Sequence, residues 1–377
     1  MPDKVRKFIY EMQYNFIILQ HQNKYSMKEI HFRDVENFDH ALHEASKTVI
    51  VTHMKPDGDA IGSSTALYHY IRKYENTETC IVLNDRPQQC LNFLMEEEIS
   101  DDMFIITEDA QKSREKIESA DLIICMDFNA FHRTDRLCGL LEASTARKVL
   151  IDHHLSPERE CFDIIFSETE VSSASELLYT ILMSMPAICG NASKLPARTA
   201  TSLMTGMTTD TNNFANSVYP STLIMASTLL AAGVNRDYIL EKLYNQHSEN
   251  RLRLLGHMMK DLLVIMPDGV AYIILDQKTQ EEYNTQEGDT EGFVNMPLSI
   301  AHVRMSILIK EDSDRLRVSI RSKKGTSANR CARLHFNGGG HENAAGGRLN
   351  IPIAEAAAYI EKHVNEYLKE EDEKHAR

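Results

Sequence analysis

The 377-residue sequence lacks any apolar stretch approaching the roughly 18 residues that a membrane-spanning helix requires. Its first 25 residues interrupt their Phe and Ile side chains with charged and amide groups, including Lys7 and Glu11, which is typical neither of a signal peptide nor of a membrane anchor. We therefore expect a cytoplasmic protein with no membrane partner.

Paired cysteines and an excess of positive charge are also missing. The seven cysteines are odd in number and scattered, without the spacing of a zinc-binding or redox motif, so free thiols are expected. With 41 basic and 55 acidic side chains, the formal net charge is −14. A protein that holds long nucleic acid by its phosphates needs a net basic surface, so long double-stranded nucleic acid is not an expected partner. Small anionic substrates remain compatible if metal ions or a local basic patch offset the acidic background.

Between about residues 47 and 230, short β-branched runs alternate with helical stretches. This alternation predicts an α/β domain with a mostly parallel sheet flanked by helices. The predicted strands are residues 48–52, 79–83, 122–126 and 148–151, and the first crossover helix is residues 63–74. Internal repeats and low-complexity tracts are absent.

After Gly233 the pattern changes, which indicates a second, smaller α/β domain. A charged helical stretch, about 248–263, precedes strand-like runs at 270–275, 303–310 and 316–320. We expect an N-terminal extension at 1–30, a first domain at 31–247 and a second at 248–377, with residues 248–263 as the linker helix. In the last run, apolar residues alternate with Arg317, Ser319 and Arg321, so a strand would present guanidinium groups on one face. That face is a candidate phosphate-binding wall, although solvated strand faces rich in Arg are common.

The segment after the first predicted strand carries His53, Asp57 and Asp59. In open α/β sheets ligands bind at the carboxyl ends of strands. The Pro and Gly within this segment disfavour a helix, so we expect a loop that turns the three side chains towards one point. The alternative is a turn whose Asp residues cap a helix beginning near Ser63.

The same arrangement recurs further along the chain. Asp127 ends the run at 122–126, and the triplet Asp152, His153 and His154 ends the run at 148–151. Adjacent histidines after a buried strand are hard to explain structurally, because buried imidazoles cost stability unless each finds a partner. Asp210 follows an apolar helical stretch, a signal that is weak alone.

Three consecutive glycines precede His341. Glycines allow the backbone to approach a phosphate closely, and His341 could donate a hydrogen bond to its oxygens. A flexible turn is the alternative interpretation.

Together these motifs resemble the DHH phosphoesterase family with its DHH-associated C-terminal domain. The resemblance covers about residues 30–365 and includes HxxPDxD at 53–59, the lone Asp127, the DHH triplet at 152–154, Asp210, and GGGH at 338–341. Within the family the chain is similar to the bacterial stand-alone oligoribonucleases, or nanoRNases, which also dephosphorylate 3′-phosphoadenosine 5′-phosphate (pAp).

The resemblance implies a hydrolase with two divalent cations. One cation would be held by His53, Asp57 and Asp127, and the other by Asp59, Asp127, His153 and Asp210, so that Asp127 bridges them. Mn²⁺ is the expected ion because the ligands mix imidazoles and carboxylates, with Mg²⁺, Co²⁺ and Zn²⁺ as alternatives. Metal-bound hydroxide would then be the nucleophile.

The resemblance also implies roles for residues that are not ligands. Asp152 is expected to orient His153, and His154 to face the scissile phosphate. The second domain is expected to clamp a terminal phosphate, across an interdomain cleft that holds the active site, through Arg321, Ser322, Gly339, Gly340 and His341. Such a clamp would favour short oligonucleotides and small nucleotides as substrates.

Other functions remain open. A phosphodiesterase for cyclic di-AMP or its linear product pApA is the main alternative, and an inorganic pyrophosphatase or exopolyphosphatase ranks lower. A nucleotide sensor would lack a ligand, and a RecJ-like exonuclease would need a basic surface. The sequence after Asp210 has Asn212 and Asn213 where many relatives have Gly-Arg, a difference that could alter substrate choice. Polarity of degradation and homodimer formation are not determined by the sequence.

Overall fold

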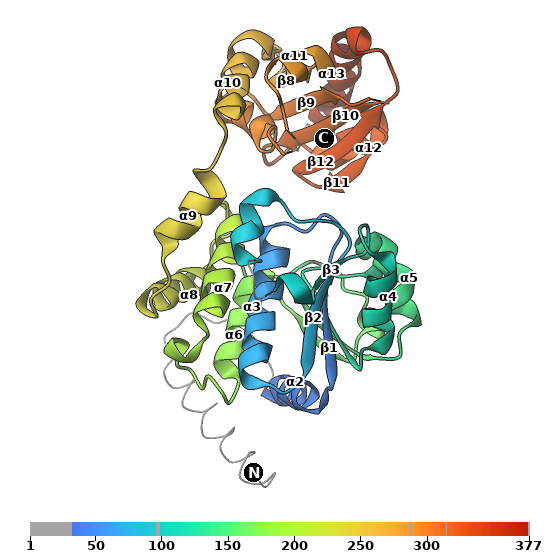
Figure 1. Ribbon diagram of the computed structural model, residues 1–377. Coiled ribbons are helices and arrows are strands. Elements are labelled where there is room, and N and C mark those ends of the chain that lie inside the picture. The colour runs from blue at the N-terminus through green and yellow to red at the C-terminus, as the bar shows by residue number, and fades with distance from the viewer. Residues whose placement is uncertain (1–31, 96–98, 287, 314, 376–377) are drawn as a thin grey trace. The chain divides into compact units, whose positions relative to one another are not determined.

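The computed structural model describes residues 32–95, 99–286, 288–313 and 315–375. The expected extension at 1–30 lies outside the described residues. Contacts divide the chain into two compact units between Gln246 and His247. Each unit is built on its own sheet, coloured from blue to green in the first and from orange to red in the second (Figure 1).

The first unit contains a six-stranded parallel sheet with strand order β3-β2-β1-β4-β5-β6. Its strands are β1 Lys47–Thr52, β2 Glu78–Leu83, β3 Met103–Ile105, β4 Leu122–Met126, β5 Arg147–Asp152 and β6 Ile164–Ser167. The four strands predicted from β-branched runs are confirmed. The short edge strands β3 and β6 were not predicted.

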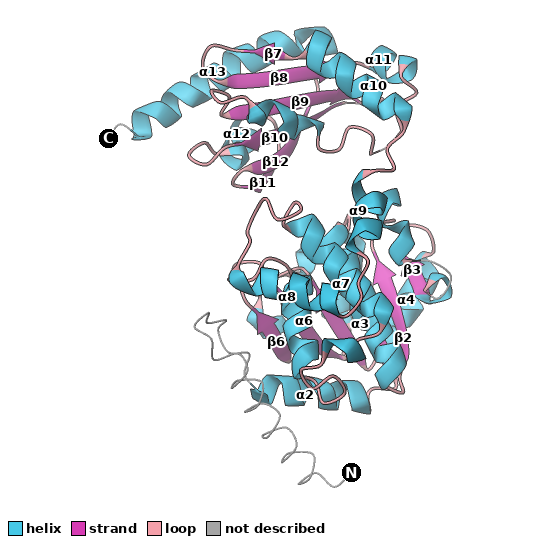
Figure 2. Ribbon diagram, turned by 90° about the vertical axis from the view of Figure 1, so that its left-hand side faces the viewer, coloured by secondary structure: helices cyan, strands magenta, loops and turns pink. Residues whose placement is uncertain are grey.

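Helices cover both faces of this sheet. The described helices of this unit are α2 Phe32–Glu44, α3 Gly58–Tyr74, α4 Ala110–Ser119, α5 Cys138–Ala143, α6 Ala174–Ser184, α7 Ala197–Asp210, α8 Pro220–Ala231 and α9 Arg236–Tyr244, with short 3₁₀ helices at Gln89–Leu94, Ser100–Asp102, Phe131–Leu137, Arg159–Cys161 and Ala192–Lys194. Helices α3, α6 and α7 lie on one face, and α4 and α5 on the other (Figures 1 and 2). Alternate strand residues supply the two cores, as in Ile50 towards α3 and Val49 towards α4. The expected α/β domain with a parallel sheet flanked by helices is confirmed.

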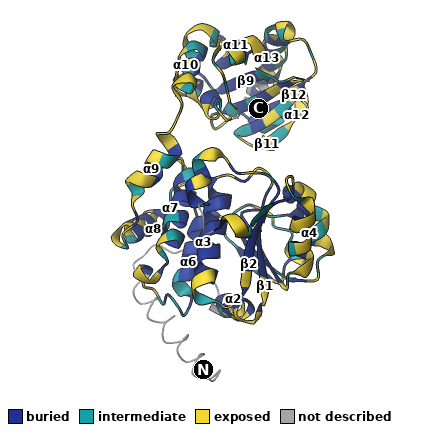
Figure 3. Ribbon diagram, in the orientation of Figure 1, coloured by how far each residue is buried: buried dark blue, intermediate teal, exposed yellow. Residues whose placement is uncertain are grey.

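Helix α3 is the most enclosed helix of the first unit and packs closely against α7. Residues 58–71 are buried, and Figure 3 shows α3 and α7 in dark blue. A Cβ atom on Gly62 would lie 2.7 Å from the Gly206 nitrogen and 2.7 Å from the Ser202 carbonyl oxygen. A glycine is therefore required where the two helix backbones meet.

The predicted start of α3 near Ser63 is wrong, because the helix begins at Gly58. The Asp57 Oδ1 atom accepts hydrogen bonds from the Asp59 N–H at 3.0 Å and the Ala60 N–H at 3.1 Å. These contacts satisfy two of the backbone donors that a helix start leaves open. Gly58 therefore opens the helix, and Asp59 lies within its first turn.

The second unit contains a mixed sheet with strand order β11-β12-β10-β9-β8-β7. Its strands are β7 Val264–Ile265, β8 Val270–Leu275, β9 Met305–Glu311, β10 Leu316–Ser322, β11 Gly339–His341 and β12 Ala344–Leu349, and only the β8–β9 pair is parallel. The helices are α10 Glu249–His257, α11 Gln277–Glu282, α12 Ala328–His335 and α13 Ala356–His375, with a π turn at Met258–Leu262 and 3₁₀ helices at Phe293–Ser299 and Ile353–Glu355. The second, smaller α/β domain is thus confirmed.

The predicted alternation along β10 is observed. Val318 and Ile320 are buried in the core that α12 and α13 cover, whereas Arg317 is exposed on the opposite face. Among the described residues, all seven cysteines are free thiols, and none of the helices is both long and apolar enough to cross a membrane.

Candidate metal centre

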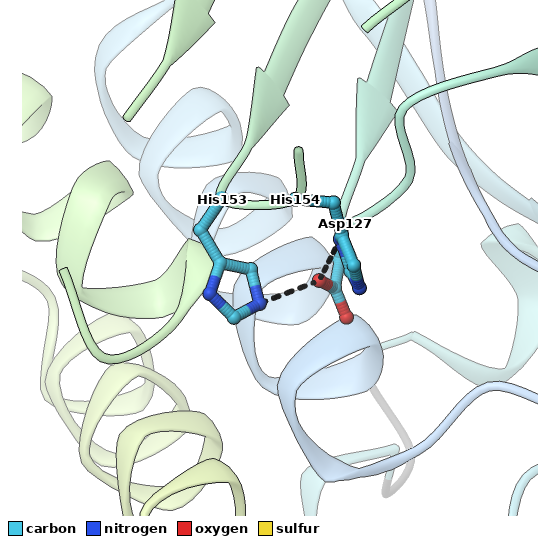
Figure 4. A group of neighbouring side chains, drawn as sticks. All are labelled: Asp127, His153 and His154. Atoms are coloured by element: carbon cyan, nitrogen blue, oxygen red, sulfur yellow. Dashed lines mark ion pairs between the residues drawn. The ribbon is translucent and has the colours of Figure 1, made fainter. Parts of the chain in front are cut away.

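The centre is assembled at the carboxyl edge of the first sheet. Strands β1, β4 and β5 are adjacent there, and His53, Asp127 and His153 follow them. The His53 Nε2 atom lies 3.4 Å from Asp127 Oδ2, and the His153 Nε2 atom lies 3.4 Å from Asp127 Oδ1. Figure 4 shows His153 and His154 on either side of the Asp127 carboxylate. The structure thus places the Asp127 carboxylate, which follows β4, between the imidazoles of His53 and His153, which follow the neighbouring strands β1 and β5.

Three groups of potential ligand atoms share this edge. One consists of His53, Asp57 and Asp127, another of Asp59, His153 and Asp210, and the third of Asp127, His153 and His154, with all ligand atoms of a group within 4.8 Å of one another. Asp210, the last residue of α7, places its Oδ2 atom 3.4 Å from the His153 Nε2 atom. The six side chains predicted as ligands are therefore brought together, from segments that lie as far apart as residues 53 and 210.

The donor set fits a pair of divalent cations. Asp59 and Asp127 are 1% and 2% exposed, and the Asp127 Oδ1 atom accepts no hydrogen bond from the described residues. Burying several carboxylates together is costly unless cations compensate them. Imidazole nitrogens and carboxylate oxygens are suitable ligands for Mn²⁺, Zn²⁺ and related ions.

Without a cation, the centre retains protons at neutral pH. Burial, followed by the charges of Asp127 and Asp57, raises the pKa of Asp210 to about 7 against the opposing effect of His153. Burial lowers the pKa of His153, but the adjacent Asp127 carboxylate, with the charges of Asp59 and Asp210, outweighs this and raises it to about 10. A divalent cation must displace such protons when it binds.

Asp59 is held by the N-terminus of α6. Its Oδ2 atom accepts a hydrogen bond from the Ala174 N–H at 2.6 Å, and its Oδ1 atom accepts one from the Ser175 N–H at 2.9 Å. The side chain of Ser173 caps this helix. A carboxylate at a helix N-terminus is favoured by the free N–H groups and by the helix dipole. The position of Asp59 therefore depends on the conformation of residues 172–175.

A buried carboxylate, Glu176, organises that turn. Its Oε2 atom accepts hydrogen bonds from the Ser172 N–H at 3.0 Å, the Ser172 hydroxyl at 2.5 Å and the Thr222 hydroxyl at 2.6 Å. Sequence reasoning missed Glu176, although Ser173 and Glu176 have the S-x-x-E spacing of a capping box. In a capping box the Glu side chain accepts a hydrogen bond from the backbone N–H of the cap residue, which here is Ser173. Glu176 instead accepts one from the backbone N–H of Ser172.

The expectation that Asp152 orients His153 is wrong. The Asp152 Oδ1 atom lies 2.7 Å from His154 Nδ1, and Oδ2 accepts the His154 backbone N–H at 3.1 Å. Alternate residues of an extended chain point to the same side, so the residue two positions on can meet the Asp152 carboxylate while His153 points away. Asp152 therefore orients His154.

The phosphate-binding residues predicted in the second domain lie along β10 and β11. Arg321 is half-buried and donates from Nη1 to the Ile320 carbonyl at 2.9 Å. The Ser322 hydroxyl is buried, donates to the Thr326 carbonyl at 2.6 Å and accepts from the Asn343 amide at 3.0 Å, so its bonds are made within the unit.

Two of the three glycines before His341, Gly339 and Gly340, form β11 with it. Gly340 has a φ of 150°, and a Cβ atom there would lie 2.5 Å from the Ala344 carbonyl oxygen, so this position requires glycine. Phosphate binding by Arg321, Ser322, Gly339, Gly340 and His341 stays a prediction.

The Asn pair after Asp210 forms a turn in the left-handed region, with φ values of 45° at Asn212 and 56° at Asn213. The Arg236 side chain on α9 donates a hydrogen bond to Asn213 and lies 5.5 Å from the ring centroid of Phe214. An arginine therefore reaches this turn from another element of the first unit.

Comparisons with known proteins match both units. Residues 47–207 match the DHH family, N-terminal domain, and residues 268–370 match the DHHA1 domain. The bifunctional oligoribonuclease and PAP phosphatase NrnA of Bacillus subtilis is 27% identical over 307 residues, which are 80% of this chain and 88% of that protein. The cyclic-di-AMP phosphodiesterase GdpP of Geobacillus thermodenitrificans is 24% identical over 345 residues, which are 88% of this chain and 49% of that protein.

A crystal structure of an exopolyphosphatase-related protein from Bacteroides fragilis is similar along its whole length. It is 35% identical in sequence and superposes with a TM-score of 0.85. The match covers 92% of this chain and 100% of that chain. The two matched domains together span more than half of the sequence, so the chain belongs to the DHH family.

Proposed function

We propose that this chain is a manganese-dependent, two-metal phosphoesterase that hydrolyses short oligonucleotides and pAp. The observation that carries the proposal is the position of the Asp127 carboxylate, 3.4 Å from the imidazoles of both His53 and His153. Asp127 is therefore positioned to be a ligand of both cations. Such a pair lowers the pKa of a bound water towards neutrality and stabilises charge on the reacting phosphate.

The protein's own residues would hold and orient the reactants. His53, Asp57 and Asp127 would hold one cation, and Asp59, Asp127, His153 and Asp210 the other. His154, oriented by Asp152, would donate a hydrogen bond to a phosphate oxygen. In the second unit, Arg321 and the β11 backbone would bind a further phosphate of the substrate.

The substrate assignment is supported by the likeness to the Bacillus subtilis oligoribonuclease and PAP phosphatase, which extends over 88% of that protein. The Geobacillus thermodenitrificans phosphodiesterase supports cyclic di-AMP or pApA as the alternative substrate, although the chain spans only 49% of it. The likeness to the exopolyphosphatase-related protein from Bacteroides fragilis supports including polyphosphate among the compounds to be tested.

The test compares kcat/KM for pAp, pApA, a ribonucleotide trimer, cyclic di-AMP, polyphosphate and pyrophosphate. Purified full-length protein is stripped of metal and reloaded with Mn²⁺, Mg²⁺, Co²⁺ or Zn²⁺. We expect Mn²⁺ with pAp or the trimer to give the highest value. Preference for pyrophosphate or polyphosphate would overturn the substrate assignment.

The Asp127→Asn variant tests the bridging role. It should lower kcat/KM for every substrate by at least about 10²–10³-fold, since a ligand of both cations is weakened at once. Metal content and circular dichroism are measured in parallel. Wild-type activity in a folded variant would exclude Asp127 as the bridge.

A further inference from the structure

The face of the second sheet opposite α12 and α13, which α10 and the 3₁₀ helix at Phe293–Ser299 cover along β8 and β9, carries a row of three cations. Arg317 on β10 is in register with Lys310 on β9 and with Arg348 on β12. Like charges directly opposite one another on neighbouring strands destabilise a sheet. Among the described residues, Asp312 forms an ion pair with Arg317 at 3.0 Å. One carboxylate facing three cations leaves this row positive, in a chain whose net charge is −14.

The same face continues along β10 through Ser319 to Arg321. At about 3.3 Å per strand residue, Arg321 lies about 13 Å from Arg317. Between them Ser319 is in register with Gly346 on β12 and with Leu308 on β9, and Leu308 is buried in a cluster with Leu254 and Phe293. Along β10 and β12 the two cationic positions are thus separated by a stretch with almost no side chain.

The glycine in that stretch is not required by the fold. A Cβ atom on Gly346 would meet only the Val318 carbonyl oxygen, at 3.5 Å, which is an ordinary contact. By contrast, a Cβ atom on Gly347, which faces the core, would lie 2.3 Å from the Phe336 carbonyl oxygen. Gly346 is also exposed, so its main effect is to keep the face between the cations bare.

We propose that this face binds the sugar–phosphate backbone of a single-stranded oligonucleotide, with one phosphate at Arg321 and another at the row of Lys310, Arg317 and Arg348. The proposal rests on the proposed function and deepens it by setting a substrate length. Neighbouring phosphates of one strand lie closer together than about 13 Å, so both positions are filled only when at least one further phosphate lies between the two that make contact. A dinucleotide or pAp reaches one position, and an oligonucleotide with at least three phosphates, such as a tetramer without terminal phosphates, reaches both.

Binding is measured without turnover, by fluorescence anisotropy of full-length, metal-free protein with labelled oligoadenylates of two to six nucleotides. For the wild type, affinity should rise from the dimer to the tetramer and then level off. The double variant Arg317→Ala, Arg348→Ala should bind the pentamer about tenfold more weakly and the dimer within twofold of wild type. Its slope of log K against log salt should fall by about 0.7, since the contact to one phosphate is lost and each contact to a single-strand phosphate contributes about 0.7.

Two further variants distinguish oligonucleotide binding at this face from nonspecific electrostatic attraction to the protein. Arg114 on α4 matches Arg317, because the two side chains are 56% and 55% exposed and each is paired with one carboxylate. Arg114→Ala should leave pentamer binding within twofold of wild type. Gly346→Val should weaken pentamer binding without a change in charge, because it fills the bare stretch.

The outcomes distinguish this inference from the proposed function. Equal losses for dimer and pentamer, or an equal loss in Arg114→Ala, overturn the inference. Displacement of the pentamer by polyphosphate at the same concentration of charge also overturns it, because a nucleotide backbone would then not be what is recognised. Failure to hydrolyse any nucleotide would overturn the proposed function, while length-dependent binding would still be observed if the inference holds.

Discussion

The Asp152 carboxylate lies 2.7 Å from Nδ1 of His154 and also accepts that residue's backbone N–H. Because Asp152 is fully buried, this contact fixes the ring and directs any substrate contact to Nε2. Asp152→Asn should lower kcat by about 10–100-fold, the range for partners that orient functional groups. Bound Mn²⁺ per chain, measured by elemental analysis, should not change. A loss of metal would instead place His154 among the ligands.

Glu176 should influence metal affinity although it is not among the candidate ligands. In Glu176→Gln, an amide can turn a donor towards the hydroxyl and N–H donors of Ser172 and Thr222, which loosens the turn that holds Asp59. We expect the Kd for Mn²⁺, measured by calorimetry, to rise about tenfold. Unfolding free energy should fall by about 1–3 kcal/mol.

The matched control for this variant is Ile181→Val on the same helix. Ile181 is fully buried and its truncation should cost about 0.5–1.5 kcal/mol through packing alone. Its Kd for Mn²⁺ should equal that of the wild type. If both variants shift Kd equally, the effect of Glu176 is only one of global stability.

Substitution by alanine should change stability in opposite directions at two helical glycines, one where α3 crosses α7 and one in α10. In Gly62→Ala, the new Cβ atom would lie 2.7 Å from backbone atoms of Ser202 and Gly206, so urea denaturation should show a loss of about 1–3 kcal/mol. At Gly256 in α10 nothing lies within 4 Å, and Gly256→Ala should stabilise its unit by about 0.5–1 kcal/mol. A neutral Gly62→Ala variant would contradict the close approach.

Manganese binding should release protons in a pH-dependent manner. At pH 6 Asp210, with its pKa raised to about 7 by burial and neighbouring charge, is mostly protonated, and at pH 8 it is mostly ionised. His153, whose pKa is about 10, holds a proton throughout this window. Proton release should therefore decrease, and Mn²⁺ affinity increase, as pH rises from 6 to 8. Calorimetry in buffers of different ionisation enthalpy measures both, and constant release across this window would refute the assignment of these protons.

Strands with long β-branched runs were predictable from sequence, whereas the edges of the sheet were not. The run ending at Met126 is strand β4 at its predicted bounds, because a buried parallel strand is apolar on both faces. Strand β3 has only three residues, and its pairing with β2 depends on tertiary contacts that no local pattern specifies.

The gathering of the candidate ligands was predictable because strand ends of a parallel sheet share one edge. The finer arrangement was not, since it depends on individual side-chain directions. Asp57 illustrates this, because the loop interpretation and the helix-cap interpretation were set against each other and the structure combines cap geometry with proximity to His53. The contact between Glu176 and Thr222 joins residues 46 positions apart, which no short motif could indicate.

The candidate metal ligands lie at the carboxyl edge of the first sheet, whereas the residues at the opposite edge, where the strands begin, stabilise the fold. There, the Asp121 carboxylate accepts hydrogen bonds from the backbone N–H groups of Ser46 and Lys47, at 3.0 Å each, and so ties the start of β1 to that of β4. New chain termini or an inserted reporter domain would be tolerated better near this edge, for example in the loop at Ser144 and Thr145, where Thr145 is exposed, than in any loop that follows β1, β4 or β5. Circular permutation could therefore rearrange this protein's chain order without touching its chemistry.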